Sequence, residues 1–340
     1  SRRLRASADT TLPLFSRLGT GASAPQMDSH NMSWIRYPSH VSPAVEDVIA
    51  AQSVISRCMH VYVALLVPLS LVTGLFNLIT FIRNHGKLVA LDMLLSGLTV
   101  TSILVTLLSL NAASRPDYIL TTNLHCGVLS FFSNMCYFNA QYLQVAMLVL
   151  FLLPGSSSYL PLAGLAAIWG CAVCSSLVVV SLLGTSRELH QTTLCQADPL
   201  TAWPEYEIVK FSLGFGLALV LKLVLLLLLS AKPAWRTALT RRDTASARWV
   251  VLAITLNMFA CRLFSSTVLL QRARRKMQRD IGSPRDELLM NLAELVLSGE
   301  SCVNSLFTLV FHKPCKLMLL DALGHLTQRC RRGGTNNSVS

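Results

Sequence analysis

The chain has 340 residues, of which 52% are hydrophobic and only 14% are charged, and its mean hydropathy is +0.52. A soluble domain carries about 25% charged residues, so this composition excludes an ordinary soluble enzyme, a disordered chain and a coiled coil. The formal charge of +12 would suit nucleic acid, but that partner needs a basic face on a folded soluble domain. Here the basic residues fall between long apolar runs, as in the polar loops of a membrane protein, so we expect no nucleic-acid partner.

The first 60 residues are polar and rich in Ser, His and Pro. They have no helical period, which predicts a disordered tail over residues 1–60. The chain begins at Ser1 and Met27 is a candidate initiator, so whether residues 1–26 belong to the native protein is left open. This stretch lacks the apolar run, roughly 7–15 residues long, of a signal peptide.

Seven apolar runs follow, each of about 20 residues or more, the length of a helix that crosses about 30 Å of hydrocarbon. They predict an all-α membrane protein, a seven-transmembrane helix bundle over residues 61–311. The second and seventh runs carry polar residues, which a bundle tolerates where they face other helices. The expected spans are 61–82, 88–110, 126–153, 159–183, 208–231, 249–270 and 288–311.

The residues after the seventh run predict a short amphipathic eighth helix over residues 312–327 that lies along the membrane surface. Pro314 breaks the preceding helix, and leucines recur beyond it at helical spacing. Residues 328–340 are polar and predict a cytoplasmic tail. Cys330 lies among arginines and is a candidate for palmitoylation, with Cys315 as its rival and a free thiol as the plain alternative.

The orientation rests on two features, because basic residues divide almost evenly between the two sets of loops and the positive-inside rule gives no answer. Asn31 begins the glycosylation sequon Asn31-Met32-Ser33, which is usable only on the lumenal side. Cys126 and Cys195 would both face the oxidising side if the N-terminus is outside, where a disulfide can persist. We therefore expect a plasma-membrane glycoprotein that crosses the membrane several times, with residues 1–60 extracellular.

Charged residues inside the expected spans identify candidate pocket residues, since a charge within the bilayer usually faces the bundle and finds a partner. Arg262 on the sixth span is expected to pair with Glu294 or Glu300 on the seventh. The pair is either the floor of a ligand pocket or a structural contact between helices. Lys222 on the fifth span is interpreted as a side chain that snorkels toward the interface. The pocket candidates are Arg262, Glu294 and Asn291.

A basic cluster follows the sixth span, with acidic residues close behind it. In an extracellular loop it would form a positive rim that attracts an acidic ligand: a small carboxylate, a phosphate or an acidic peptide. Two alternatives stay open. The run extends the sixth helix and is neutralised by the acidic residues, or it contacts lipid phosphates. The basic residues are Arg272, Arg274, Arg275, Lys276 and Arg279.

The sequence carries no enzyme motif of the types HExxH, P-loop or GxGxxG, so we expect neither catalysis nor a cofactor. Cys171 and Cys174 have CxxC spacing. They lie inside the fourth expected span without a second pair of ligands, which disfavours a metal site.

Over about residues 60–330 the chain resembles the rhodopsin-like (class A) G-protein-coupled receptors. Asn77 in GLFNLITF matches the Asn of helix one, and Trp169 in LAAIWGCAV matches the Trp of helix four. Ser102 in LLSGLTVTSILVTLL stands near the Asp of helix two, so the family's sodium site lacks its carboxylate. Asn304 in CVNSLFTLVF falls where the family has NPxxY. The resemblance also implies a disulfide between Cys126 and Cys195.

The chain departs from the family's activation motifs. Its helix three has Leu150-Phe151-Leu152 near the expected place of DRY, and its helix six has Cys261-Arg262-Leu263-Phe264 in place of CWxP. The resemblance implies a divergent orphan receptor that transduces a signal from an extracellular ligand, with a heterotrimeric G protein and membrane lipids as partners. The alternative is a non-signalling seven-span protein, such as a transporter or a trafficking partner.

Overall fold

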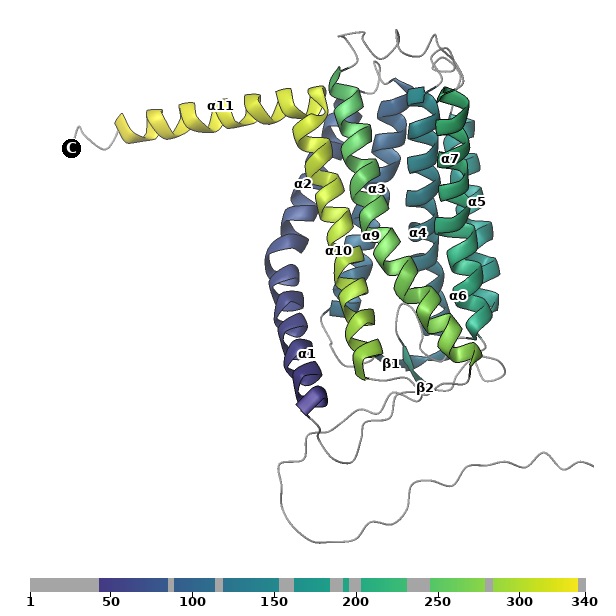
Figure 1. The fold of residues 1–340 in the computed structure, drawn as a ribbon. Coiled ribbons are helices and arrows are strands. Elements are labelled where there is room, and N and C mark those ends of the chain that lie inside the picture. The colour runs from purple at the N-terminus through teal and green to yellow at the C-terminus, as the bar shows by residue number, and fades with distance from the viewer. Residues whose placement is uncertain are drawn as a thin grey trace, which may run out of the picture. The chain divides into compact units, whose positions relative to one another are not determined.

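The computed structural model describes residues 43–84, 89–113, 119–152, 162–183, 192–195, 203–230, 245–278 and 284–335. The described chain is almost entirely helical, with a two-stranded sheet. Figure 1 shows the long helices side by side, the sheet at one end of the bundle and α11 leaving from the other. We call these the sheet end and the α11 end. The glycosylation candidate Asn31 and the basic residue Arg279 lie outside the described residues.

The first candidate membrane span belongs to one continuous helix that contains a wider π-helical turn. Pro68 accounts for this turn, because proline has no N–H to donate and its ring clashes with the carbonyl four residues earlier. A π-helical turn just before the proline accommodates both. The three parts are α1 (Pro43–Val61), η1 (Tyr62–Leu66) and α2 (Val67–Arg83).

This helix begins earlier than the sequence predicts. α1 starts at Pro43, within the region that we expected to be a tail without helical period. Its apolar residues are spaced among charged and hydroxyl residues, which hides the period, and the helix gains its support from packing against α10. The predicted tail boundary at residue 60 is therefore corrected to no later than residue 42.

The remaining helices complete the bundle, and a second π-helical turn joins α6 to α7. Six stretches of the described chain are long and apolar enough to cross a membrane: Ser53–Arg83, Ala90–Leu110, Ala163–Ser181, Pro204–Leu227, Trp249–Met277 and Leu288–Phe311. The helices are α3 (Ala90–Ala113), α4 (Asn123–Leu152), α5 (Leu162–Ser181), α6 (Pro204–Phe211), η3 (Ser212–Gly216), α7 (Leu217–Ser230), α9 (Ala245–Met277) and α10 (Pro284–Phe311).

α4 is the one expected span that is absent from these six stretches. It has 30 residues, but polar side chains lower its hydropathy. Asn134, Asn139 and Gln144 are fully buried, and Gln141 is 1% exposed. α4 packs against α3, α5, α7 and α9, so these side chains face protein. Within the described residues there are thus six candidate spans, and α4 is a further helix long enough to cross a membrane.

The bundle is apolar outside and partly polar inside, the reverse of a soluble protein. Leu65, Val72 and Leu227 are each more than 60% exposed, whereas buried positions include Asn77, Lys222, Arg262 and Glu300. Backbone groups are satisfied within the helices, as hydrocarbon requires. These features identify the chain as a multi-pass membrane protein. The apolar core toward the α11 end contains Phe81, Leu94, Leu95, Leu143, Met147, Ile254 and Met258.

The sheet adjoins α4, because its first strand ends where α4 begins. β1 (Ile119–Thr122) pairs antiparallel with β2 (Thr192–Cys195), and Ile119 stands opposite Cys195. The hydroxyl of Thr122 accepts a hydrogen bond from the backbone N–H of His125 at 3.3 Å, which caps the start of α4. β2 also contacts α4, so the sheet holds the backbone of Cys195 near the helix whose first turn contains Cys126.

α11 (Lys313–Thr335) is longer than the predicted helix over 312–327 and continues into the predicted tail. Its first turns pack against α10 and α2. Leu317, Leu320 and Leu323 are 56%, 55% and 50% exposed. No described part of the protein covers this apolar stripe, which suits a helix at a membrane surface.

Candidate functional site

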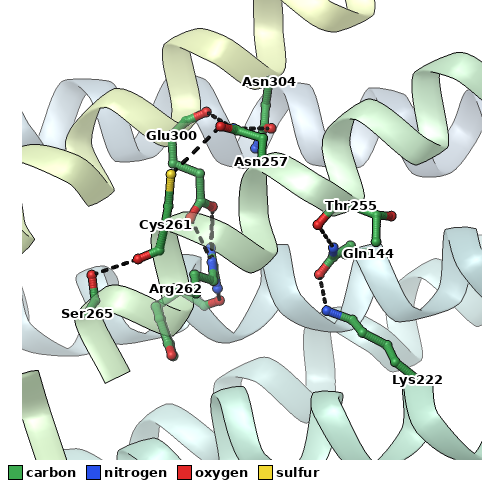
Figure 2. A network of polar contacts seen from close by, with 10 residues as sticks. Gln144, Lys222, Thr255, Asn257, Cys261, Arg262, Ser265, Glu300 and Asn304 are labelled. Atoms are coloured by element: carbon green, nitrogen blue, oxygen red, sulfur yellow. Dashed lines mark hydrogen bonds and ion pairs between the residues drawn. The ribbon is translucent and has the colours of Figure 1, made fainter. Parts of the chain in front are cut away.

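The centre of the bundle holds a buried ion pair between Arg262 of α9 and Glu300 of α10 (Figure 2). Nε of Arg262 donates to both carboxylate oxygens at 3.0 and 2.9 Å, and Nη2 donates to Oε1 at 2.7 Å. Nη1 donates to the backbone carbonyl of Tyr137 on α4 at 2.8 Å. We call Arg262 and Glu300 the central ion pair. It connects three helices, and each side chain is about 5% exposed.

The ring of Tyr137 faces two cations. The guanidinium carbon of Arg262 lies 4.6 Å from the ring centroid, and Nζ of Lys210 lies 5.2 Å from it. Such contacts contribute more where the cation is desolvated, and both Arg262 and Lys210 are buried. Gly214 in η3 makes room for the ring, because a Cβ there would lie 2.5 Å from Cε1 of Tyr137.

An amide layer adjoins the central ion pair toward the α11 end. Nδ2 of Asn257 donates to Oδ1 of Asn304 at 2.9 Å and to the backbone carbonyl of Glu300 at 3.4 Å. The thiol of Cys261 lies 3.7 Å from Oδ1 of Asn257. Asn304, which the sequence singled out by its motif position, therefore belongs to the same network as the central ion pair (Figure 2).

Lys222 points into the bundle instead of snorkelling outward, which corrects the sequence interpretation. The residue is 8% exposed, and its Nζ donates to Oε1 of Gln144 at 2.6 Å. Nε2 of Gln144 donates in turn to the backbone carbonyl of Thr255 at 3.3 Å. The interpretation was wrong because the acceptor that Lys222 finds lies on another helix, 78 residues earlier in the chain.

At the sheet end, Glu207 of α6 is fully buried and binds two cations of α9. Nε of Arg272 lies 2.5 Å and Nζ of Lys276 lies 2.6 Å from its Oε1. Arg275 forms an ion pair with Asp286. Of the predicted rim, Arg274 is exposed.

This arrangement corrects the expected basic loop. α9 continues to Met277 and so includes Arg272, Arg274, Arg275 and Lys276. Arg272 is 5% exposed and therefore does not lie on a solvent-exposed rim. The alternative of a helix extension neutralised by acidic residues is the better description. Its main acidic partner, Glu207, lies far upstream and was missed. The signal that could have identified it is a carboxylate in the first turn of the apolar helix that begins at Pro204.

The predicted pocket residues do not all meet. Of the two pairings expected for Arg262, the structure has the one with Glu300. Glu294 and Asn291 are half-buried on α10 and lie about two turns nearer the sheet end. All of the nitrogens of Arg262 donate to Glu300 or Tyr137, so the structural contact between helices fits Arg262 better than the floor of an open pocket.

The other motif positions lie inside or beside the bundle. Asn77 is fully buried, and its Nδ2 donates to the backbone carbonyl of Ser305 at 2.9 Å, which ties α2 to α10. Ser102 is 4% exposed on α3, and Trp169 is half-buried on α5.

The structure describes the side chains of two of the four cysteines that the sequence singled out for a disulfide or for palmitoylation. Cys126 is 3% exposed and disulfide-bonded; the side chain of Cys195 is outside the described part, so their pairing stays a prediction. Cys315 is fully buried, with its sulfur 3.3 Å from Nδ1 of His312. Burial raises the pKa of the Cys315 thiol to about 12. An inaccessible, protonated thiol is a poor lipidation site. The side chain of Cys330 is also outside the described part.

Asp92 and His312 join α3 to the start of α11 and were not identified from the sequence. Nε2 of His312 lies 2.9 Å from Oδ1 of Asp92, and the imidazole packs against the ring of Phe81 at 5.3 Å between centroids. Thr80 donates to the sulfur of Met318 at 3.1 Å. These contacts anchor the first two turns of α11.

Within the described residues, no group of three or more His, Cys, Asp or Glu side chains could hold a metal ion. A comparison with protein-family models finds no match to this chain, and a search of curated proteins finds none either.

Proposed function

We propose that the chain is a divergent receptor of the rhodopsin-like class in the plasma membrane, with α4 as a seventh span. In this arrangement the sheet end and the N-terminus are extracellular, and α11 lies on the cytoplasmic membrane surface. The order of the helices supports the proposal, as do the sheet beside the start of α4 and the exposed leucine stripe of α11. The proposal includes a Cys126–Cys195 disulfide, a glycan on Asn31 and an acyl chain on Cys330.

The observation that carries this proposal is the central ion pair. Its Arg262 stands where the receptor family that the chain resembles has the Trp of CWxP, and the pair connects α4, α9 and α10. Packed interfaces move between discrete arrangements rather than deforming continuously. A ligand that binds one arrangement better than the other would shift their populations, which is the physical basis of signalling. The heterotrimeric G protein would then bind near the α11 end.

An acidic ligand suits the charge of the sheet end. Among the described residues there, Arg272 and Lys276 share the buried carboxylate of Glu207, Lys210 is buried beside the ring of Tyr137, and Arg274 is exposed. Positive potential of this kind accelerates the arrival of anions and weakens with salt. Arg274 is the exposed member of this group, so we propose it, rather than Arg272 or Lys276, as the first contact.

The test is a G-protein activation assay on the full chain in cells, without ligand and with a panel of small carboxylates, phosphates and acidic peptides. We expect an acidic compound to activate, and Arg274→Gln to weaken its potency with normal surface expression. Lys313→Gln, an exposed change on α11, is the control and should leave potency unchanged. No basal or ligand-dependent activation with any G protein would contradict the proposal.

A non-signalling transporter is the second candidate, and one observation favours it. Charges buried within membrane spans mark ion or proton pathways in many transporters, and Lys222, Arg262 and Glu300 are such charges. Uptake of a radiolabelled anion that depends on the chain, in the absence of G-protein activation, would favour this function over the receptor.

A further inference from the structure

Lys222 and its neighbours on α4 form a second buried polar group, distinct from the central ion pair. Nζ of Lys222 donates to Oε1 of Gln144 at 2.6 Å, and no described carboxylate forms a salt bridge with it. Glu300 already neutralises Arg262. The described interior around Lys222 therefore carries one positive charge without a bonded counter-charge.

Gln141 lies on α4 one helical turn before Gln144, the residue that binds Lys222. It is 1% exposed, and neither its amide nitrogen nor its amide oxygen has a hydrogen-bond partner. Residues three and four apart share one face of a helix. Gln141 therefore lies between Gln144, which binds Lys222, and Tyr137, whose carbonyl binds Arg262. A buried amide without a partner in a native structure indicates a water or an ion that completes it.

We infer that Lys222 and Gln141 bind a small inorganic anion of the halide class inside the bundle, with Gln144 positioning the lysine. An ammonium has three N–H donors and a carboxamide nitrogen has two. After the bond to Gln144, two donors of Lys222 and both of Gln141 face the interior without a described acceptor. A halide accepts several such hydrogen bonds and neutralises the ammonium, whereas a water molecule would satisfy the amide and leave the charge uncompensated.

This inference is independent of the proposed receptor function, because it concerns the stability of the bundle and not its signalling. Anything that binds the folded chain and not the unfolded one raises the unfolding temperature as its concentration rises. Chloride should therefore stabilise the protein specifically. The effect should exceed that of a bulky organic anion, which is too large to bind between two buried side chains.

The experiment measures thermal unfolding of the purified full chain in detergent, in sodium chloride, sodium bromide and sodium gluconate at equal ionic strength, so that screening is the same in each. We expect the unfolding temperature to be a few degrees higher in both halides than in gluconate, and to saturate with halide concentration. Lys222→Met and Gln141→Leu should each abolish this difference. The exposed Lys316→Met is the matched control and should keep it.

Gln141→Leu keeps the test decisive if Lys222→Met does not fold, because the amide of Gln141 has no protein hydrogen bond to lose. Equal unfolding temperatures of the wild-type chain in chloride and gluconate would overturn the inference. A halide effect that persists unchanged in Gln141→Leu would overturn it as well, since the anion would then bind elsewhere.

Discussion

Arg262 and Glu300 lose their hydration when α9 and α10 pack together, and each compensates the charge of the other. Removing one partner leaves a buried charge unpaired, which costs about 3–5 kcal/mol. At about 2–4 °C per kcal/mol, the conversion for domains of about 150–250 residues, Arg262→Met and Glu300→Met should each lower the unfolding temperature of the purified protein by roughly 10 °C.

The double variant Arg262→Met/Glu300→Met is the control for this prediction, because it leaves no buried charge. We expect it to be less destabilised than the sum of the two single variants, as for any pair in direct contact. Strictly additive losses would show that the two side chains do not depend on each other.

Cys315 should resist thiol reagents in the folded protein. The thiol is fully buried and burial raises its pKa from 9.0 to about 12, so almost none is thiolate at pH 7 to 9. A maleimide should label the exposed Cys58 in detergent within minutes and should reach Cys315 only after denaturation. Cys315→Ser should therefore leave the native labelling count unchanged, and a lower native count would contradict the buried position.

The raised pKa of Cys315 also determines how this thiol changes the stability of the folded chain with pH. The unfolded chain releases the Cys315 proton near pH 9, whereas the folded chain holds it to about pH 12. The folded state binds more protons in that window, so this group's contribution to stability falls as the pH rises above about 9.

Sequence reasoning could predict that Arg262 needs a carboxylate partner, because an unpaired charge in a span is costly. It could not choose between Glu294 and Glu300. The choice depends on how far α10 is shifted along its axis relative to α9, which brings Glu300 opposite Arg262. It also depends on the carbonyl of Tyr137, which accepts a hydrogen bond from the remaining guanidinium nitrogen.

At the scale of the element, η3 should depend on the glycine at its centre. A Cβ on residue 214 would lie 2.5 Å from Cε1 of Tyr137, so Gly214→Ala must displace the ring that Lys210 and Arg262 contact. We expect a lower unfolding temperature and less monodisperse protein by size-exclusion chromatography. Gly170→Ala on α5 meets nothing within 4 Å and should be tolerated; equal losses in both would contradict this role of Gly214.

Helix positions were easier to predict than helix ends. Apolar runs indicated the six stretches that could cross a membrane, but not the start of α1 at Pro43 or the extension of α9 to Met277. Both extensions depend on tertiary contacts. α1 packs against α10, and the basic end of α9 binds the distant Glu207. Local periodicity carries no information about such partners.

At the scale of the whole molecule, composition was enough to predict a helical protein that crosses the membrane several times. It was not enough to fix the number of crossings. α4 was expected as the third span, and within the described residues it is not among the six stretches that are apolar enough, because its buried amides lower its hydropathy. A hydropathy threshold identifies helices whose side chains face lipid. α4 packs against α3, α5, α7 and α9, so its polar side chains face protein instead. The same amides that lower its hydropathy form the interior contacts with Lys222 and Thr101.

The crossing number decides on which side of the membrane the two ends lie. Seven crossings put the N-terminal region and the end of α11 on opposite sides, whereas six put them on the same side. The direct measurement is antibody labelling of cells that express the full chain with one tag before Ser1 and another after Ser340. The seven-helix receptor predicts that the first tag is labelled on intact cells and the second only after permeabilisation. Labelling of both tags on intact cells, or of neither until permeabilisation, would contradict it.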